Sequence, residues 1–326
     1  FELTKENSLM EINIFENKDF AKLPSNLSFI KHCRKITTLI DINPICKFYL
    51  QGYQKLYYNS IKKLIVTSCS CGLGRSEVIQ LLESNKNMTD LSLKINFNLL
   101  ELNYFDTIID LKRLKYLSLS NSNISDMGLK DCLEQLPHLE GLKIIHFPNL
   151  YLFNLYIPTL KEISINRCNN IDNEFLGIFI KSHPLLEKID FSNMSIGISS
   201  SLLLARYAKK ITHLNLSYSD NIINDLDLAL ICSNCRELIH IDLSCTFISD
   251  KSMESISIGC KKLKTLIIPY TAVGNRGIHT LLKKIDSIIF LDLRHTLINK
   301  DILKVFKGFP NLYYSVEHQI IKEKLD

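Results

Sequence analysis

The sequence predicts an α/β solenoid, a curved row of about 12 stacked repeats in which each repeat contributes one strand and one helix. Two observations lead to this fold. A three-point apolar pattern at positions 1, 4 and 6 of each repeat recurs along the chain every 21–27 residues. The alternation at positions 4 and 6 is typical of a half-buried strand, and a turn and a stretch with helical apolar spacing follow it.

The repeats begin at Leu9, and the last clear repeat starts at Ile288. One repeat, near Ile36, is irregular because Asp41 falls at position 6, so either its register starts at Thr37 or its strand is bulged. With this repeat included, 35 of the 36 pattern positions (12 repeats of three) are apolar, against about 17 expected from bulk composition. The other repeats start at Ile61, Met88, Leu114, Leu139, Leu160, Leu186, Ile211, Leu238 and Leu263.

Helix-compatible segments follow the strands. Asp126 stands before Leu129 and Leu133, a spacing that places an apolar stripe on one helix face behind a capping residue. Asp250 stands in the same way before Met253. Four prolines lie near repeat ends, where they can end a helix without breaking one, namely Pro137, Pro158, Pro184 and Pro310.

The domain boundaries follow from the repeats. We expect a short entry segment at residues 1–8, the solenoid at residues 9–311, and a C-terminal cap or tail at residues 312–326 that begins like a thirteenth strand. The repeat at residues 139–159 has only 21 residues, too few for a full helix, so we expect an irregular outer segment there. A docking site at this point is the less favoured alternative to a simple deletion.

Composition and charge exclude several classes of protein. The 326 residues are 46% apolar and carry a formal net charge of +5 without a run of like charges, so neither disorder nor a nucleic-acid or membrane partner is expected. No stretch of 18 apolar residues and no signal-peptide pattern occurs, and the ten cysteines form no dense cluster. Dispersed reduced thiols are typical of intracellular proteins, so we expect a soluble protein of the cytoplasm or nucleus.

No arrangement of residues predicts catalysis, a metal site or a cofactor. Cys232 and Cys235 have metal-ligand spacing but no second pair at zinc-finger distance. Cys69 and Cys71 also lack partners, and the segment Gly72–Ser76 lacks the Gly-Lys-Ser/Thr ending of a phosphate loop. The nine histidines are dispersed, and no nucleophile with a neighbouring base can be identified. We therefore expect a protein that is not an enzyme and uses no cofactor.

The expected geometry favours recognition of a protein partner by the strand face. Strands stack about 4.8 Å apart whereas helices need about 10 Å, so a row of repeats must curve with its strands on the concave side. Positions 3, 5, 7 and 8 then face a partner, whereas the small residues at position 9 suit bonds to the backbone of the turn. From Leu186 onward the facing positions carry aromatic, acidic and basic residues, a mixture typical of protein-binding hot spots.

The predicted partner-binding residues on the concave face are Asp190, His213, Tyr218, His240, Asp242, Tyr270, Phe290, Asp292, Arg294 and His295. The alternative, that these residues only cover a solvated sheet, stays open. The earlier repeats, with Ser92, Ser118, Ser120 and Ser164 at such positions, are predicted to present a flatter and less adhesive surface.

The segment Leu238–Asp250 reads Leu-Ile-His-Ile-Asp-Leu-Ser-Cys-Thr-Phe-Ile-Ser-Asp, and Leu114–Asp126 follows the same order of residue types. Cys33, Cys235 and Cys260 each stand three residues before a repeat start. These features resemble leucine-rich repeats of the cysteine-containing subtype, the repeat domain of F-box substrate receptors. The resemblance covers the predicted solenoid and implies a horseshoe with parallel strands inside and helices outside.

The resemblance implies the substrate-binding part of an SCF-type ubiquitin ligase receptor, which would hold a protein partner and act by positioning. An adaptor and a cullin would bind through an F-box module outside this sequence, because only the segment Ala21–Pro24 resembles that module, and faintly. The chain begins at Phe1 rather than at Met, which indicates an internal segment or an artificial start, so a module before residue 1 is left open. The alternative is a scaffold subunit of a larger cytoskeletal or ciliary assembly. A secreted receptor ranks last, since only Cys33 and Cys46 could pair in an N-terminal cap.

Overall fold

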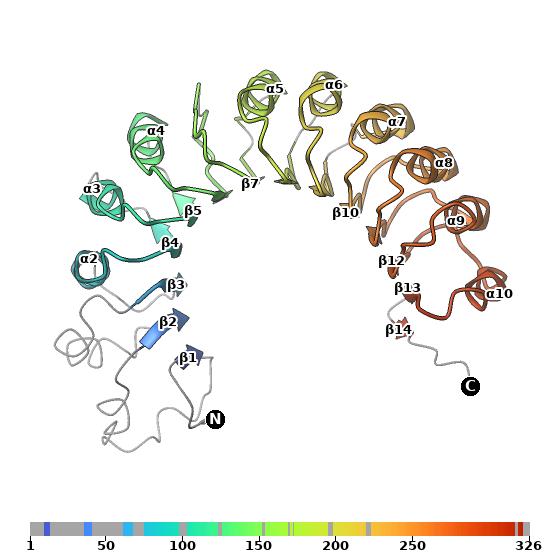
Figure 1. Cartoon of the computed structure of the whole chain (residues 1–326), viewed down its shortest axis with the longest axis horizontal. Helices are drawn as coiled ribbons and strands as arrows, with labels where there is room; N and C mark the ends of the chain where they lie inside the picture. The colour runs from blue at the N-terminus through green and yellow to red at the C-terminus, as the bar shows by residue number, and fades with distance from the viewer. Residues whose placement is uncertain are drawn as a thin grey trace, which may run out of the picture. The chain divides into compact units, whose positions relative to one another are not determined.

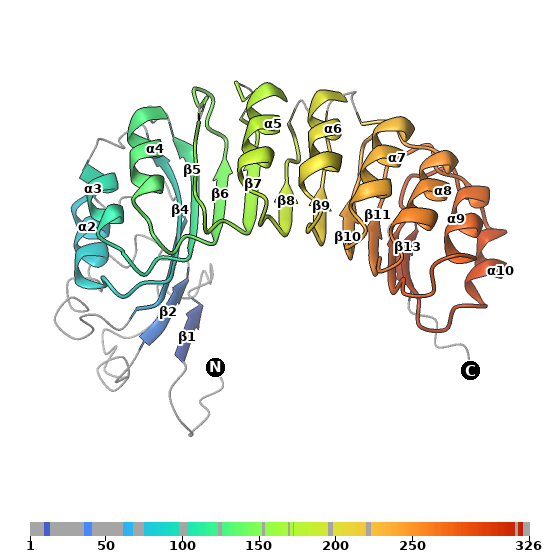
Figure 2. The same ribbon diagram turned by 45° about the horizontal axis from the view of Figure 1, so that its top comes forward.

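The computed structural model describes residues 10–13, 36–40, 61–67, 75–97, 103–122, 126–151, 154–168, 170–171, 173–194, 198–219, 223–316 and 319–321. The chain divides into two compact units, Phe1–Phe147 and Pro148–Asp326, called the N-terminal unit and the C-terminal unit below. In each of them parallel strands lie side by side and helices cover one face of the strands (Figures 1 and 2).

In the N-terminal unit, neighbouring strands pair in parallel and in chain order. The described strands are β1 (Met10–Asn13), β2 (Ile36–Ile40), β3 (Lys63–Thr67), β4 (Asp90–Phe97), β5 (Tyr116–Ser122) and β6 (Gly141–Ile145). The described helices are α2 (Arg75–Ser84), α3 (Asn103–Ile109) and α4 (Asp126–Glu134). Helices α2, α3 and α4 follow β3, β4 and β5, so strand and helix alternate as the sequence predicts.

In the C-terminal unit, strands pair in parallel from β7 to β13, and β14 pairs with β13 in the antiparallel direction. The strands are β7 (Glu162–Asn166), β8 (Lys188–Asp190), β9 (His213–Asn215), β10 (His240–Asp242), β11 (Thr265–Ile267), β12 (Phe290–Asp292), β13 (Tyr313–Val316) and β14 (Gln319–Ile321). The helices are α5 (Asn173–Ser182), α6 (Ile198–Tyr207), α7 (Asp225–Asn234), α8 (Asp250–Gly259), α9 (Asn275–Leu282) and α10 (Ile302–Phe306). Within this unit the row bends with its helices outside, as their greater width requires (Figure 1). None of the described helices combines the length and apolar character needed to cross a membrane.

The strand register confirms the repeat pattern. Every predicted repeat has a strand at its start, and equivalent pattern positions face each other, as Leu214 faces Ile241. In the irregular repeat, Leu39 pairs with Leu64, which is the register that starts at Ile36. A register shift between β1 and β2 accompanies this repeat. Asp41 lies outside the described residues.

The core lies between the strands and the helices. Positions 4 and 6 are buried in both units, with Leu117 and Leu119 on β5 and Leu214 on β9 as examples. The apolar stripe of each helix is buried from the other side, as Leu133 of α4 and Ile256 of α8 show. Each such side chain contributes about 1.5–3 kcal/mol through loss of water contact.

The helix starts of the C-terminal unit differ from the sequence expectation in one detail. The N-cap of α8 is Ser249, whose hydroxyl accepts the N–H of Lys251, and not Asp250. The carboxylate of Asp250 instead accepts, at 2.7 Å, the N–H of Gly274, the N-cap residue of α9. In the preceding repeat, Asp225 accepts the N–H of Ser249 at 2.8 Å. These two aspartates therefore link the starts of successive helices.

The C-cap residues of helices α7 and α8 are Cys235 and Cys260. The backbone N–H groups of these two cysteines close the last helical turn on the carbonyls of Ile231 and Ile256. Both thiols are fully buried. The position three residues before a repeat start is therefore a packing position in these two repeats.

The short repeat at residues 139–159 contains no helix among its described residues. Its outer segment is irregular, as its length predicts, and buries Phe147, Leu150, Leu155 and Ile157. The predicted thirteenth strand is also present as β13. The expectation that residues 312–326 cap the solenoid remains a prediction.

Candidate functional site

Each strand from β7 to β12 is followed, at position 8 of its repeat, by a residue with a left-handed backbone. These residues have φ between 54° and 57° and are Arg167, Asn193, Tyr218, Cys245, Tyr270 and His295. Side chains other than glycine rarely adopt this conformation, so surrounding bonds must hold it. The N–H of Tyr218 donates to the carbonyl of Ser244 at 2.9 Å, and that of Tyr270 to the carbonyl of Arg294 at 3.1 Å. The backbone of each tyrosine is thus anchored to the next repeat.

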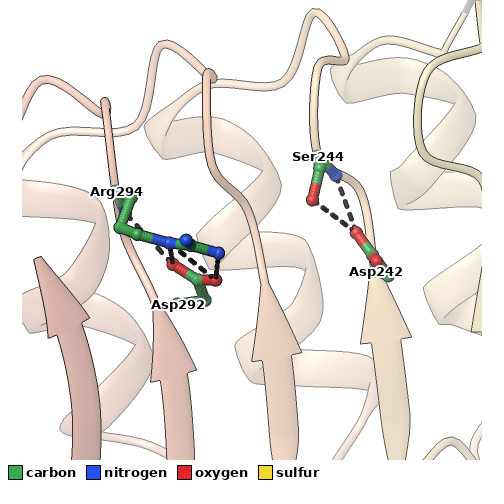
Figure 3. A network of polar contacts seen from close by, with 4 residues as sticks. All are labelled: Asp242, Ser244, Asp292 and Arg294. Atoms are coloured by element: carbon green, nitrogen blue, oxygen red, sulfur yellow. Dashed lines mark hydrogen bonds and ion pairs between the residues drawn. The ribbon is translucent and has the colours of Figure 1, made fainter. Parts of the chain in front are cut away.

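The side chain at position 5 fixes the turn that precedes this residue. Asp242 Oδ1 accepts the backbone N–H of Ser244 at 3.0 Å and its hydroxyl at 2.6 Å (Figure 3). The same two bonds join Ser192 to Asp190, and Ser217 to Asn215. A side chain that accepts the N–H at position 7 competes for this N–H with the backbone carbonyl groups that hold neighbouring strands together. At position 9 the hydroxyls of Thr246 and Thr271 donate to the backbone of the same turns, as the sequence predicts.

Asp292 and Arg294 form a closed ion pair. Arg294 Nε donates to Asp292 Oδ1 at 2.9 Å, and Nη2 donates to Oδ2 at 2.6 Å (Figure 3). The hydrogen bond and the charge of Asp292 raise the pKa of Arg294, and the carboxylate is only 5% exposed. The three aspartates predicted as partner contacts, Asp190, Asp242 and Asp292, therefore all bond within their own strand ends.

The histidines at position 3 lie side by side. The rings of His213 on β9 and His240 on β10 stack with centroids 5.6 Å apart and an interplanar angle of 24°. Burial lowers the pKa of both imidazoles below the ordinary value. Phe290, at the same position of β12, is half-buried. Position 3 thus forms a largely uncharged floor from β9 to β12.

Three of the predicted site residues, Tyr218, Tyr270 and His295, are exposed at position 8. Together with the half-buried Cys245, which the sequence analysis did not single out, they are called the strand-end row below. Tyr218 and Tyr270 are 50% and 56% exposed. Tyr270 stacks on His295 with ring centroids 4.3 Å apart. The negative charge that Cys245 carries as a thiolate, together with a hydrogen bond between the two side chains, raises the pKa of Tyr218, so the sulfur lies against the phenol. The structure therefore brings the position-8 residues together on consecutive repeats.

A second exposed row escaped the sequence analysis. Phe247 is 63% exposed and Leu297 is 69% exposed. Both lie at position 10, where the N–H of Phe247 bonds the carbonyl of Ile223 and that of Leu297 bonds the carbonyl of Val273. A signal was present, because Phe247 directly precedes the buried Ile248, and neighbours in an extended segment point to opposite sides.

The described strands of the N-terminal unit present smaller side chains. Ser92 and Ser118 occupy position 5, and Ser120 occupies position 7. Tyr116 lies over Gly141 of the next strand, because a Cβ at Gly141 would collide with the tyrosine ring. Tyr116 is nevertheless 40% exposed, and the flatter surface expected from the sequence remains a prediction.

No group of three or more His, Cys, Asp or Glu side chains among the described residues could hold a metal ion. Three thiols do lie close together at the ends of α7 and α8. Burial raises the pKa of Cys235 to about 12, and a hydrogen bond to Cys260, with burial, raises the pKa of Cys232. Thiols held in the protonated form are poor metal ligands. Cys69, Cys71 and the glycines at positions 72 and 74 lie outside the described residues.

Solved structures show the fold. A chain of the yeast Rad7 and Elc1 complex is 16% identical, with 88% of this chain and 79% of that chain covered and a TM-score of 0.59. An internalin (inlF) from Listeria monocytogenes str. 4b F2365 is 14% identical, with 87% and 78% covered and a TM-score of 0.50. No protein-family model and no curated protein matches the chain. The parallel strands, the covering helices and these similarities together establish a leucine-rich-repeat solenoid fold.

Proposed function

We propose that this chain is a non-enzymatic protein-recognition solenoid that binds a partner protein on the strand side of its C-terminal unit. The observation that carries the proposal is the strand-end row, in which large side chains are exposed while their backbone is bonded to the next repeat. Rigid aromatic side chains lose little conformational entropy when they bind. Tyrosine is also enriched among binding hot spots.

The predicted residues contribute to this surface in different ways. Tyr218, Tyr270 and His295 are the direct contacts, because they are exposed. The position-5 side chains act by holding the turns: Asp292 before His295, Asp242 before Cys245 and Asn215 before Tyr218. Arg294, 44% exposed at its side chain, presents a guanidinium whose orientation Asp292 fixes. The half-buried His213, His240 and Phe290 form the floor beside this row.

The finer proposal is that recognition serves ubiquitin transfer, with this chain as the substrate-binding part of an SCF-type receptor. The repeat consensus resembles that of F-box receptors, and Cys235 and Cys260 are buried at the positions typical of the cysteine-containing subtype. A similar chain was crystallised in the complex of Rad7 and Elc1, so this fold occurs as one member of an assembly. The substrate would be positioned near a ubiquitin-charged enzyme, and the adaptor and cullin would bind a module outside this sequence.

Affinity purification from cells, with quantitative mass spectrometry, tests the surface. The variant Tyr218→Ala/Tyr270→Ala/Phe290→Ala should lose at least one associated protein about tenfold or more, equivalent to about 1.4 kcal/mol, with little change in thermal stability. Ile258→Ala is the matched control, because it removes an exposed aliphatic side chain from α8 in the same unit. Unchanged recovery of every associated protein by the triple variant would show that the surface is assigned wrongly.

A scaffold subunit is the second candidate. The bonds from Asp225 and Asp250 to the next helix start link consecutive repeats, and a rigid spacer needs such links. The same purification separates the two candidates. Recovery of an adaptor and a cullin with the full-length protein favours the receptor. A stable stoichiometric complex that contains neither favours the scaffold.

A further inference from the structure

The stacked histidines have unequal electrostatic surroundings. His213 on β9 is in register with Lys188 on β8, and Lys188 pairs with Glu162 of β7 at 2.6 Å. The charge of Lys188 disfavours a second cation at His213, and Glu162 opposes this effect only in part. His213 is therefore flanked by one cation on β8 and would be flanked by a second if His240 took up a proton.

His240 has a more favourable position for a proton. Asp242 lies two residues along the same strand, and its charge favours the protonated imidazole. On the β11 side His240 is in register with Thr265, which carries no charge. The only titratable neighbour across the strand pair is His213. A first proton therefore goes to His240.

The Thr212 hydroxyl holds the ring of His213 in place. It lies 2.8 Å from His213 Nδ1 and 3.1 Å from the carbonyl of Glu187, which also accepts the backbone N–H groups of Thr212 and His213. Nδ1 is therefore engaged in a hydrogen bond with Thr212.

We propose that His213 and His240 bind one proton as a coupled pair on acidification, so that this part of the recognition surface changes from an uncharged aromatic floor to a cationic one. Stacked rings this close cannot both become cations without direct repulsion, and the flanking Lys188 adds a further positive charge. The gained charge favours acidic groups of a partner at lower pH. This consequence for binding rests on the proposed function, whereas the coupling of the two rings does not.

Long-range proton–nitrogen NMR of the imidazoles tests the coupling. In the wild-type protein His240 should titrate first and His213 at distinctly lower pH. In His240→Phe, which keeps a stacked ring but removes the charge, the midpoint of His213 should rise by more than about 0.5 pH unit. Lys188→Met should raise it as well. An unchanged His213 midpoint in His240→Phe overturns the proposal, and His240→Gln decides the question if the Phe variant does not fold.

The binding consequence has a separate readout. Recovery of associated proteins is compared at pH 7.5 and pH 6.0 for the wild type and for His213→Phe/His240→Phe, whose rings cannot titrate. The wild type should show pH-dependent recovery and the double variant should not. The same pH dependence in both overturns the effect on binding. Coupled titration without any bound protein at either pH supports the histidine pair and contradicts the proposed function instead.

Discussion

The strands of the two units differ in length although their repeats share one apolar pattern. In the N-terminal unit β4 has 8 residues and β5 has 7, whereas each strand from β8 to β12 has 3. Position 5 carries Ser92 and Ser118 in the long strands and Asp190, Asn215, Asp242 or Asp292 in four of the five short ones. Only the short strands have an acceptor that takes the N–H of position 7.

The fifth short strand, β11, is short for a different reason. In β11, position 5 is Ile267, but position 7 is Pro269, which has no N–H to contribute to a ladder. The strand again stops, and Tyr270 takes the left-handed conformation. The comparison indicates that a strand is shorter where the N–H at position 7 is bonded by a side chain or is missing. The left-handed backbone at position 8 is more general, because His146 and Arg167 adopt it after β6 and β7, where position 5 is Lys143 or Ser164.

Substitutions in the core should lower the free energy of unfolding by similar amounts in both units, and this is the largest expected effect. Leu119→Ala on β5 and Leu243→Ala next to β10 each remove a buried position-6 side chain and should lower the free energy of unfolding by about 2–5 kcal/mol, since each leaves a cavity. Urea denaturation followed by circular dichroism measures both. A loss below about 1 kcal/mol in one unit only would show that its strands are not packed as described.

His183 should give a smaller loss that depends on pH. Its Nε2 accepts the N–H of Ile157 at 2.9 Å and its Nδ1 bonds the carbonyl of Phe179 at 2.7 Å. His183→Leu should cost about 1–3 kcal/mol at pH 7.5, because the buried Ile157 N–H loses its acceptor. Through these two bonds His183 links Ile157, in the irregular segment of the short repeat, to Phe179 of α5.

The sign of the pH effect follows from burial. Burial lowers the pKa of His183 in the folded state, so its contribution is full above the unfolded value of about 6.5 and is lost as the pH falls through the lower folded value. The difference in unfolding free energy between wild type and His183→Leu should therefore shrink on acidification from pH 7.5 to 5. A constant difference across that range would mean that the imidazole is not held neutral.

Asp242 tests the turn directly. Asp242→Ala removes the acceptor for the N–H and hydroxyl of Ser244 and should cost about 1–2 kcal/mol. Asp242→Asn keeps a carbonyl acceptor, as Asn215 does naturally in β9, and should cost much less. Chemical denaturation gives both values, and hydrogen exchange of the Ser244 amide reports the bond itself. Equal losses for the two variants would contradict the role of position 5.

Ser118→Asp should transfer the short-strand turn to the N-terminal unit, with the smallest energetic effect. The variant gives β5 the order Asp-Leu-Ser that ends β10. We expect β5 to end earlier and Asn121 to adopt a left-handed backbone, with a change in stability below about 0.5 kcal/mol. Backbone chemical shifts at Asn121 provide the measurement. An unchanged extended conformation there would show that more than position 5 is needed.

Most of the fold could be predicted from the sequence because the apolar positions repeat. Leu214, Ile241 and Leu266 recur at position 4 of successive repeats, and one register buries all of them. The missing helix of the short repeat followed from its length. The N-cap of α8 could not be assigned, because Ser249 and Asp250 are both good capping residues and the choice depends on Gly274 in the next repeat.

The candidate site was only partly predictable. Tyr218 and Tyr270 are exposed, but the bonding of Asp190 and Asp242 within the turn was missed. In the sequence, an aspartate at an outward strand position cannot be distinguished from an ordinary surface charge. Its partner here is largely a backbone N–H, which almost every residue type carries. The recurring Asp/Asn-x-Ser order would have been the signal. Whether the predicted residues contact a partner remains a prediction.

The parallel ladder determines how this surface could evolve. Each repeat from Leu186 to Leu263 places one side chain at the left-handed position, and its main chain is tied to the following repeat through bonds that involve no side chain of that residue. Replacing Tyr218 or Cys245 therefore changes one point of the array and leaves its neighbours in place. A solenoid built in this way can acquire a new specificity through a few local substitutions, without redesign of its interior.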